Sequence, residues 1–433
     1  MGAGGSGYAA ARLALSRGAT VTVFDSGSPE KLAPSVAKFA DIGVTLVCGD
    51  DALRPAGSYD CTVSSPGIDT VWPIAKAFAA ASRELIGEIE FAWRLGTAPV
   101  IAVTGTNGKT TTTSLITEML KAAGLRAVAA GNIGLPYSEV VLSGEVYDWV
   151  VLELSSFQLE TISTFSPRIA LWMNFAPDHM DRYATVQDYY DAKYRIFDYM
   201  APESLAVHKL ECEMNLPVRT TAFSAFREGG AFRYEVGTIV APDGRTYPYA
   251  SGELQGKHNA ENVMAALAVA DELGLGWEGI APAMLAFRAP AHRCERVAEI
   301  DGVLYLNDSK STNLHSLESA LMGQDEPVVL IAGGKNKGLD FSELREVAGR
   351  MVREAVCIGE IADHIAEAWQ GSVPTRKAAT LDEAVATAKG LARAGEIVLF
   401  SPGTSSFDMF TGYEARGVAF RKAVAGLAPE FPA

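Results

Sequence analysis

The chain contains 433 residues, 48% of them hydrophobic and 21% charged, and its formal net charge is −15. A chain of this length accommodates about three domains, and the acidic balance argues against a nucleic-acid-binding protein, which would carry a basic surface. The five cysteines form no CxxC pair, and no apolar run approaches the roughly 20 residues of a membrane-spanning helix. The sequence therefore favours a cytoplasmic protein with reduced thiols and no membrane segment.

Short apolar runs alternate with amphipathic helical stretches along the whole chain. This alternation predicts an α/β fold with mostly parallel sheets. Stretches with proline or glycine at 96–99 and 289–293 are typical of linkers, and they divide the chain into pieces 1–96, 97–289 and 290–433. Alternating Tyr, Thr and Gly at 225–255 indicates a small β-structure inside the second piece. The clearest strand candidates are 20–24, 100–103, 149–152, 327–331 and 396–400.

The first piece opens with a glycine pattern. Gly2, Gly4 and Gly7 have GxGxxG spacing, and Asp25 lies after the next strand. This spacing is typical of a turn that holds the diphosphate of a dinucleotide, but alone it is weak support for any one ligand. A strand normally precedes such a turn, whereas only Met1 precedes it here. We therefore expect the first sheet to lack its central strand in this numbering.

The strongest local signal is a strand followed by a glycine loop and a helix start. The apolar run at 100–103 leads into Thr-Gly-Thr-Asn-Gly-Lys-Thr-Thr at 104–111, and a helix is expected through 112–123. Backbone N–H groups of such a loop bind phosphate, Lys109 would reach the β- and γ-phosphates, and Thr110 would ligate Mg²⁺. Val103 replaces the first glycine of the general pattern. The alternative is an ordinary threonine-rich turn, which Gly-Lys-Thr at a helix start argues against.

Two further segments carry candidate metal ligands. Glu153 ends the apolar strand at 149–152, and Asp178 and His179 follow the strand expected at 169–174. A carboxylate at the carboxyl end of a strand suits Mg²⁺ beside a phosphate loop. Alone these signals are weak, because acids often end strands and a histidine in a polar turn more often makes a local hydrogen bond.

Taken together, the polar segments resemble those of the Mur ligase family, and within it the branch that adds D-glutamate. The resemblance covers essentially the whole chain, in the family's order and near its spacing, and a valine at the first loop position is typical of the family. The segments are 103–111, Gly-Asn-Ile-Gly at 131–134, Glu-Leu-Ser-Ser-Phe-Gln-Leu at 153–159, Asp-His-Met-Asp-Arg at 178–182, His-Asn-Ala-Glu-Asn at 258–262 and Asn-Asp-Ser-Lys-Ser-Thr-Asn at 307–313.

The resemblance implies three domains and an ATP-dependent ligase reaction. The first domain would be Rossmann-like and bind a UDP-linked substrate, the second a P-loop-type ATPase domain, and the third a Rossmann-like domain that binds the amino acid. The enzyme would join UDP-N-acetylmuramoyl-L-alanine to D-glutamate through an acyl phosphate, in cytoplasmic peptidoglycan precursor synthesis. The family also implies a monomer.

The resemblance implies that Lys109, Glu153, His179 and Lys193 are the catalytic residues, and it also implies metal ligands. Two Mg²⁺ ions would be held by Thr110, Glu153, His179 and Lys193, the lysine being converted to a carbamate by CO2. Taken alone, Lys193 would be read as a surface lysine on an amphipathic helix. A carbamate would supply the oxygen ligands that Mg²⁺ prefers, and it requires a neutral, buried amine.

The remaining ligand contacts are also carried over by resemblance. The ATP set is Gly105, Thr106, Asn107, Gly108, Lys109, Thr110, Thr111, Asn259, Asn262, Arg293 and Asp308, although Asn259 taken alone would be a helix cap. The UDP-substrate set is Ser6, Asp25, Ser26, Gly67 and Asn132. The D-glutamate set is Lys310, Thr312, Lys337, Ser406 and Tyr413. The family often has Phe in place of Tyr413 and uses its backbone, so little effect of this change is expected.

Several alternatives compete with this reading. A family member that adds L-alanine is possible, whereas one that adds a diamino acid would carry Asp-Asn-Pro-Arg, which is absent here. A folylpolyglutamate synthetase would lack the UDP-type first domain. An NAD-dependent oxidoreductase would explain the GxGxxG pattern but not Lys109, Glu153 or Lys193. A non-catalytic nucleotide-binding module would not need the metal ligands.

Overall fold

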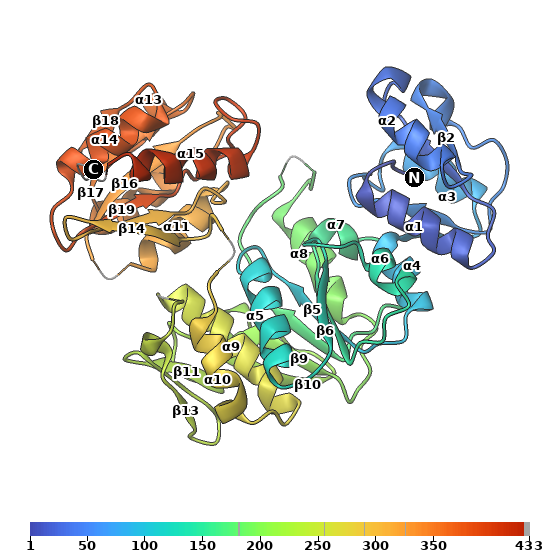
Figure 1. The fold of residues 1–433 in the computed structure, drawn as a ribbon, viewed down its shortest axis with the longest axis horizontal. Helices are drawn as coiled ribbons and strands as arrows, with labels where there is room; N and C mark the ends of the chain where they lie inside the picture. The colour runs from blue at the N-terminus through green and yellow to red at the C-terminus, as the bar shows by residue number, and fades with distance from the viewer. Residues whose placement is uncertain (181, 255, 290, 325, 428–433) are drawn as a thin grey trace, which may run out of the picture. The chain divides into compact units, whose positions relative to one another are not determined.

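The computed structural model describes residues 1–427 except Asp181, Gln255, Pro290 and Asp325. The chain forms two compact units. The first comprises Met1–Tyr247 and Glu261–Leu285, and the second comprises Pro248–Ala260 and the residues from Ala286 onward. Figure 1 shows the helices and strands of each unit. The proposed boundary at Pro290 lies outside the described residues, and the division into three domains stays a prediction.

The amino-terminal part of the first unit has two separate pairs of parallel strands. β1 (Thr22–Asp25) pairs with β2 (Thr45–Cys48), and β3 (Thr62–Ser64) pairs with β4 (Leu85–Gly87). Among the described residues no strand joins β1 to β3. The accompanying helices are α1 (Gly5–Ser16), α2 (Pro29–Ala40), α3 (Pro73–Ala81) and α4 (Glu88–Leu95).

A nine-stranded sheet forms the rest of the first unit, in the order β13-β12-β11-β10-β9-β8-β5-β7-β6. The strands from β6 to β11 are parallel, whereas β12 and β13 are antiparallel to their neighbours. The strands are β5 (Val100–Thr104), β6 (Ala127–Gly131), β7 (Trp149–Glu153), β8 (Ile169–Trp172), β9 (Leu205–Lys209), β10 (Arg219–Ser224), β11 (Phe232–Glu235), β12 (Thr238–Val240) and β13 (Thr246–Tyr247). The 225–255 segment thus extends this sheet.

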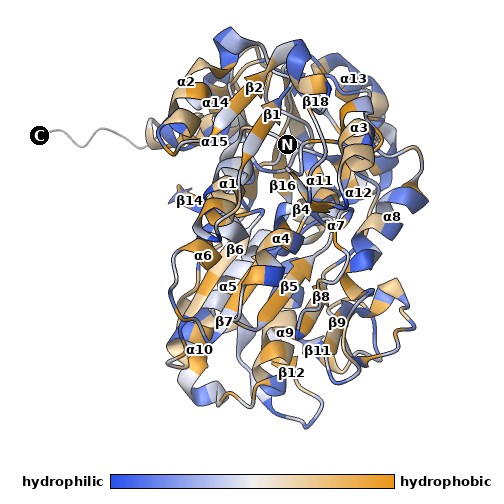
Figure 2. Cartoon of the chain, turned by 90° about the vertical axis from the view of Figure 1, so that its right-hand side faces the viewer, coloured by the Kyte–Doolittle hydropathy of each residue, from blue (hydrophilic) through white to orange (hydrophobic). Residues whose placement is uncertain are grey.

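The middle strands of this sheet form the core of the first unit. All residues of β5 and β8 are buried, and the central strands are largely orange in Figure 2. Continuous apolar runs of this kind are typical of parallel strands covered on both faces. The associated helices are α5 (Lys109–Ala122), α6 (Tyr137–Leu142), α7 (Ser156–Leu159), α8 (Val186–Tyr194), α9 (Lys257–Glu272) and α10 (Trp277–Ala286).

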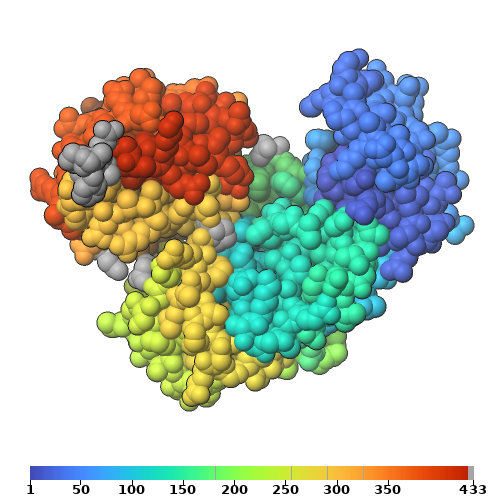
Figure 3. Space-filling view, viewed as in Figure 1, coloured from blue at the N-terminus to red at the C-terminus, as the bar shows by residue number. Residues whose placement is uncertain are grey.

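The amino-terminal part packs on the central sheet through α1 and α4, which both contact α6. The guanidinium of Arg12 donates to Glu139 at 2.7 Å, and the surface of the first 50 residues meets that of the α6 region in Figure 3. Glu90, whose side chain is fully buried, accepts from the backbone N–H groups of Ser163, Thr164 and Phe165. These contacts hold the amino-terminal glycine turn (residues 2–7) and the central sheet in one unit.

The second unit contains a six-stranded sheet in the order β14-β15-β19-β16-β17-β18. β14 is antiparallel to β15, and the other pairs are parallel. The strands are β14 (Glu295–Ile300), β15 (Val303–Asn307), β16 (Val328–Gly333), β17 (Val352–Ile358), β18 (Thr375–Lys377) and β19 (Ile397–Phe400). The helices are α11 (Leu314–Met322), α12 (Arg345–Met351), α13 (Ala362–Ala368), α14 (Leu381–Leu391) and α15 (Tyr413–Ala425).

The α/β class with mostly parallel sheets is confirmed. No helix among the described residues is long and apolar enough to cross a membrane.

Candidate active site

The glycine loop lies between β5 and α5, and two of its glycines are required by its shape. Gly105 has φ +144°, and Gly108, the residue before α5, has φ +80°. A Cβ on Gly108 would lie 2.5 Å from Oδ1 of Asn262, an oxygen that also accepts from Thr112 at 3.1 Å. The helix begins at Lys109, three residues earlier than expected, so its first N–H groups belong to the loop itself.

Asn174, which the sequence analysis did not single out, holds the loop in place. Its Oδ1 accepts from the backbone N–H of Asn107 at 2.8 Å, and its Nδ2 donates to the Asn107 carbonyl at 3.1 Å. Thr106 donates through its hydroxyl to the Ala176 carbonyl at 3.0 Å. The only signal in the sequence was the position of Asn174 just after β8, because parallel strands beside β5 end at the same edge of the sheet.

Lys109 and Lys193 converge on one carbonyl group. Nζ of Lys109 donates to the Gly105 oxygen at 2.9 Å and to the Thr106 oxygen at 2.8 Å. Nζ of Lys193, from α8, donates to the same Gly105 oxygen at 2.9 Å. The structure therefore brings together two amines that lie 84 positions apart in the sequence.

Lys193 is only 2% exposed, so it is not the surface lysine that its helix alone would suggest. Burial lowers the pKa of its amine well below the ordinary value, and repulsion from Lys109 lowers it further. Asp178 and Glu153 act in the opposite direction but are outweighed. The neutral, nucleophilic form is therefore easier to reach than in an exposed lysine.

Glu153 ends β7 with one carboxylate oxygen paired and the other unpaired. Oε1 accepts from Nδ2 of Asn132 at 2.9 Å, whereas buried Oε2 has no hydrogen-bond partner among the described residues. The backbone fixes this pair, because the Asn132 N–H donates to the Glu153 carbonyl at 2.9 Å. A buried carboxylate oxygen without a donor is costly unless a cation binds it. The residue thus fits a divalent metal ligand.

The other candidate ligands differ in exposure. Thr110 is buried, 6% exposed, in the first turn of α5. The side chain of His179 is 45% exposed, its backbone has φ +57°, and its ring centroid lies 4.9 Å from that of Phe157. Among the described residues no three His, Cys, Asp or Glu side chains form a ready metal site. A metal at Glu153 would therefore need other ligands, such as the Thr110 hydroxyl.

In the amino-terminal part, Asp25 supports the glycine turn. Its Oδ2 accepts from the N–H of Ala3 at 2.8 Å, and its Oδ1 accepts from Gly27 at 2.9 Å. Ser6 lies in the first turn of α1, Ser26 is exposed after β1, and Gly67 is exposed in the turn after β3.

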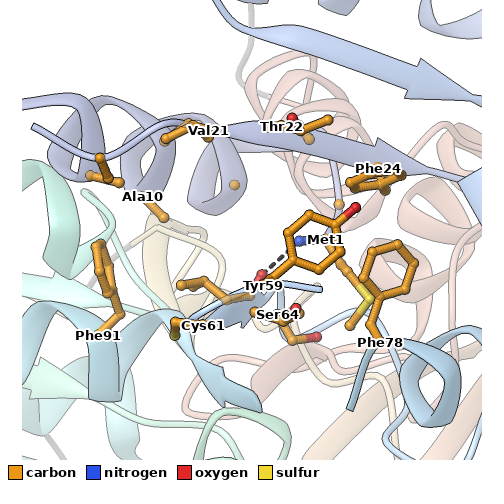
Figure 4. A pocket seen from close by; sticks show the side chains of 18 of the residues that line it. Met1, Ala10, Val21, Thr22, Phe24, Tyr59, Cys61, Ser64, Phe78 and Phe91 are labelled. Atoms are coloured by element: carbon orange, nitrogen blue, oxygen red, sulfur yellow. Dashed lines mark hydrogen bonds between the residues drawn. The ribbon is translucent and has the colours of Figure 1, made fainter. Parts of the chain in front are cut away.

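A cavity of about 640 Å³ lies in the gap between β1 and β3. Figure 4 shows Met1 inside it, with Val21, Thr22 and Phe24 on one side and Cys61 and Ser64 on the other. The Met1 amine donates to the Val63 carbonyl at 2.6 Å, and the Met1 carbonyl accepts from Ser65 at 3.0 Å. Gly2 donates to the Phe24 carbonyl at 2.8 Å. Met1 and Gly2 thus make the contacts of a strand between β1 and β3.

Asp308 and Arg293 lie in the second unit, where Asp308 follows β15. Its Oδ2 accepts from the Ser401 hydroxyl at 2.8 Å and its Oδ1 from the Cys294 N–H at 3.1 Å. Burial raises the pKa of the carboxyl to about 7, although these bonds and the charge of Arg293 oppose the shift. Asn259, in the same unit, is the third residue of α9 and not its cap, because the helix begins at Lys257.

The candidate amino-acid residues lie at the carboxyl ends of neighbouring strands. Nζ of Lys310 donates to the hydroxyl of Tyr413 at 2.9 Å, and the Tyr413 carbonyl accepts from Ser309 at 2.9 Å. The Tyr413 hydroxyl thus makes a contact that a phenylalanine would lack, and the expectation that the change has little effect stays a prediction. Thr312 is partly buried, Ser406 is 2% exposed, and Lys337 is exposed.

Arg416, which sequence reasoning missed, joins two of these loops. It is 1% exposed and donates to the Ser309 hydroxyl, the Ser309 carbonyl and the Thr404 carbonyl at 3.0, 2.7 and 3.0 Å. Its pKa is lowered to about 10 by burial. An arginine inside a helix carries no local signal that it is buried.

Comparison with protein families gives two matches. The model for the Mur ligase middle domain matches residues 103–270, and the model for the Mur ligase glutamate ligase domain matches residues 292–403. A UDP-N-acetylmuramoylalanine–D-glutamate ligase from Syntrophotalea carbinolica is 42% identical, with 99% of this chain and 97% of that protein covered. The ligase of the same name from Geobacter metallireducens is 41% identical, with 98% and 95% covered.

Solved structures support the same fold. MurF ligase from Thermotoga maritima, in complex with ADP, gives a TM-score of 0.60 at 18% identity, covering 87% of this chain and 96% of that one. The UDP-N-acetylmuramate–alanine ligase MurC from the same organism gives 0.60 at 18% identity, covering 99% and 98%. A pseudomurein peptide ligase from Methanothermus fervidus gives 0.62 at 16% identity, covering 98% of each chain.

Proposed function

The chain belongs to the Mur ligase family, and we propose that it adds D-glutamate to UDP-N-acetylmuramoyl-L-alanine with cleavage of ATP to ADP and phosphate. The observation that carries this proposal is the group of Lys109, Lys193 and Glu153 around the glycine loop, in a chain 42% identical to a D-glutamate ligase over nearly its full length. Its placement in cytoplasmic peptidoglycan precursor synthesis, and the monomeric state, are predictions that go with it.

The reaction has two steps. The substrate carboxylate attacks the γ-phosphorus of ATP, so that an acyl phosphate forms and ADP leaves. The amine of D-glutamate then attacks the acyl carbon, phosphate leaves, and the amine nitrogen loses a proton to solvent. Phosphoryl transfer of this kind depends on positioning and on neutralising charge.

The residues around the glycine loop suit the first step. The N–H groups of residues 105–111 and the start of α5 would hold the phosphates, and Lys109 would turn from its carbonyl acceptors toward the β- and γ-phosphates. Asn262 would contact the nucleotide beside the loop, and the resemblance adds Asn259, Arg293 and Asp308 to the nucleotide-binding residues. These roles are supported by the resemblance, and for Thr110, Asn262 and Asp308 also by burial.

Mg²⁺ would neutralise the carboxylate and phosphate charges that the reaction brings together. Glu153 and Thr110 would hold one ion, and His179 together with carbamylated Lys193 would hold a second. The support for a cation at Glu153 is its buried, unpaired Oε2.

Lys193 would react with CO2 to give a carbamate and release a proton. Its burial and the neighbouring cation Lys109 favour the neutral amine that this reaction needs. The carbamate would then be an oxygen ligand, and its negative charge would be balanced by the metal and by Lys109.

The two other substrates would bind at strand ends. Ser6, Asp25, Ser26, Gly67 and Asn132 would hold the UDP-linked substrate, and Lys310, Thr312, Lys337, Ser406 and Tyr413 would hold D-glutamate. Support comes from Asp25 at the end of β1, Asn132 after β6 and Lys310 after β15, because the carboxyl ends of parallel strands are common ligand sites.

We also infer that the gap between β1 and β3 has room for one further parallel strand. Met1 forms backbone hydrogen bonds with Val63 and Ser65 next to β3, and Gly2 forms one with Phe24 of β1. These are the hydrogen bonds that a strand between β1 and β3 would make. The apolar cavity continues along both strands from there. A strand in this place would join the two pairs into one sheet in front of the glycine turn.

The test of the proposed function is phosphate release from ATP in the presence of UDP-N-acetylmuramoyl-L-alanine. D-glutamate, L-glutamate, L-alanine and diaminopimelate are supplied one at a time. Release with D-glutamate alone supports the proposal. Release with L-alanine or diaminopimelate would assign another ligase of the family, and release with none would favour a non-catalytic nucleotide-binding module.

A further inference from the structure

Arg182 connects two loops of the first unit that are far apart in the sequence. Its Nη1 donates to the Pro66 carbonyl at 3.0 Å, in the turn after β3. Its Nη2 donates to Oε2 of Glu160 at 2.5 Å, just after α7, and its Nε lies 3.8 Å from Oδ2 of Asp69. The side chain is 12% exposed, and its Cζ lies 4.1 Å from the centre of the Phe157 ring. A planar guanidinium can serve several acceptors in this way, whereas an ammonium cannot keep the same geometry.

One end of this connection is the turn that carries His179. The backbone N–H groups of Arg182 and Tyr183 both donate to the His179 carbonyl, at 3.0 and 3.1 Å. The Tyr183 hydroxyl donates to Oε1 of Glu160 at 2.5 Å, so the same carboxylate holds both residues. The His179 ring packs on Phe157, over which the Arg182 guanidinium also lies. A shift of Arg182 would therefore move His179.

The other end is the turn that carries Gly67. Pro66 precedes Gly67 directly, and Asp69 closes the turn by accepting from the Val71 N–H at 2.9 Å through Oδ1. Asp69 is 8% exposed, so its pairing with Arg182 is shielded from solvent. The hydrogen bond from Ser65 to Met1 ties this turn to the amino-terminal glycine turn.

We propose that Arg182 is a positioning residue that couples the UDP-substrate turn at Gly67 to the metal ligand His179. This inference rests on the proposed function, because it takes Gly67 and His179 to be ligand-binding residues. Arg182 touches neither substrate nor metal in this role. It holds the two turns at a fixed separation, so that the carboxylate of the bound substrate lies beside the metal.

The coupling has a kinetic signature that a purely structural ion pair lacks. Loss of Arg182 should raise both the KM for the UDP-linked substrate and the free Mg²⁺ concentration that gives half-maximal rate. The KM for ATP should change little, because Asn174 and Ala176 hold the glycine loop by direct hydrogen bonds. A residue needed only for stability would lower the melting temperature and leave these constants unchanged.

The experiment compares Arg182→Gln, Arg182→Lys and Asp69→Asn with the unaltered chain in steady-state kinetics. Arg126→Gln is the matched control, since Arg126 forms an ion pair with Glu145 but is 57% exposed. We expect Arg182→Gln to raise the substrate KM and the Mg²⁺ requirement each by about ten-fold, and the ATP KM by less than about two-fold. Arg182→Lys and Asp69→Asn should give smaller changes in the same two constants, and Arg126→Gln none.

The outcomes separate this inference from the proposed function. If the unaltered chain does not turn over, the proposed function fails. If it does turn over and a folded Arg182→Gln keeps both constants, or raises the ATP KM equally, the coupling is wrong. If Arg182→Gln does not fold, Asp69→Asn tests the coupling instead, because it removes only the negative charge of Asp69. An unchanged substrate KM and an unchanged Mg²⁺ requirement in Asp69→Asn would also overturn the coupling.

Discussion

The amines of Lys109 and Lys193 donate hydrogen bonds to the same oxygen, the backbone carbonyl of Gly105. Two amines that share one acceptor repel each other when both are charged, and this repulsion adds to the effect of burial in lowering the pKa of Lys193. Lys193 is the more buried of the two, at 2% exposed. The relationship links the phosphate loop to the lysine on α8 and leads to the first prediction.

Replacing Lys193 by Ala should abolish turnover, with a loss of at least about a hundred-fold in kcat, because a charged group at the reacting centre is removed. Stripping CO2 from the buffer should lower the activity of the unaltered chain, and bicarbonate should restore it. Rates of phosphate release measure both effects. The exposed Lys121→Ala serves as control. Full turnover of Lys193→Ala would exclude a carbamate role.

Replacing Gly108 by Ala should weaken ATP binding by about ten-fold or more. The new Cβ would lie 2.5 Å from Oδ1 of Asn262 and would disturb the loop. Gly124→Ala is the matched control, because Gly124 has φ +81° and no neighbour within 4 Å. The left-handed backbone alone should cost about 1 kcal/mol of stability at either position. Nucleotide titration calorimetry and thermal unfolding separate the two effects, and equal ATP affinities would contradict the account.

The free energy of unfolding should depend on pH through Asp308. Its pKa is raised by burial from the ordinary 3.8 to about 7, so the folded state binds more protons than the unfolded state between these pH values. The contribution of Asp308 to stability is therefore present at low pH and is lost as the pH rises toward 7. Denaturant unfolding from pH 4 to 8 should show a slope that Asp308→Asn lacks. Parallel curves for the two proteins would contradict the raised pKa.

A short apolar strand placed before Met1 should stabilise the amino-terminal part and tighten binding of the UDP-linked substrate. About five β-branched or apolar residues match the usual strand length and would fill the cavity between β1 and β3. The Met1 nitrogen would become an amide, which removes a buried amine whose pKa is lowered to about 6 by burial. A Gly/Ser segment of equal length is the control. Equal melting temperatures for both extended chains would show that no strand enters the gap.

The features visible in the sequence were those set by local geometry. Gly105, Gly108 and Lys109 follow a strand at fixed spacing, and Glu153 ends another strand, so both could be placed at one edge of the sheet. The α/β class likewise follows from runs of apolar residues, whereas the two compact units were not predicted. Asn132 and Glu153 were assigned to different ligands, and only the pairing of β6 with β7 shows that they are hydrogen-bonded.

The features hidden from the sequence depend on tertiary contacts. The burial of Lys193 depends on the glycine loop 88 residues away, and the burial of Arg416 on Ser309 and Thr404. Arg182 belongs to a recognised motif, but nothing local indicates its bond to Pro66. Such residues are found only when the loops that they join are seen together.

The most direct test of the central claim is the mass of the product formed from UDP-N-acetylmuramoyl-L-alanine, ATP and an equimolar mixture of D-glutamate and isotope-labelled L-glutamate. The account predicts a single product that carries one unlabelled glutamyl residue, formed in step with ADP and phosphate. A product carrying the label, or ATP cleavage without an amide product, would contradict it.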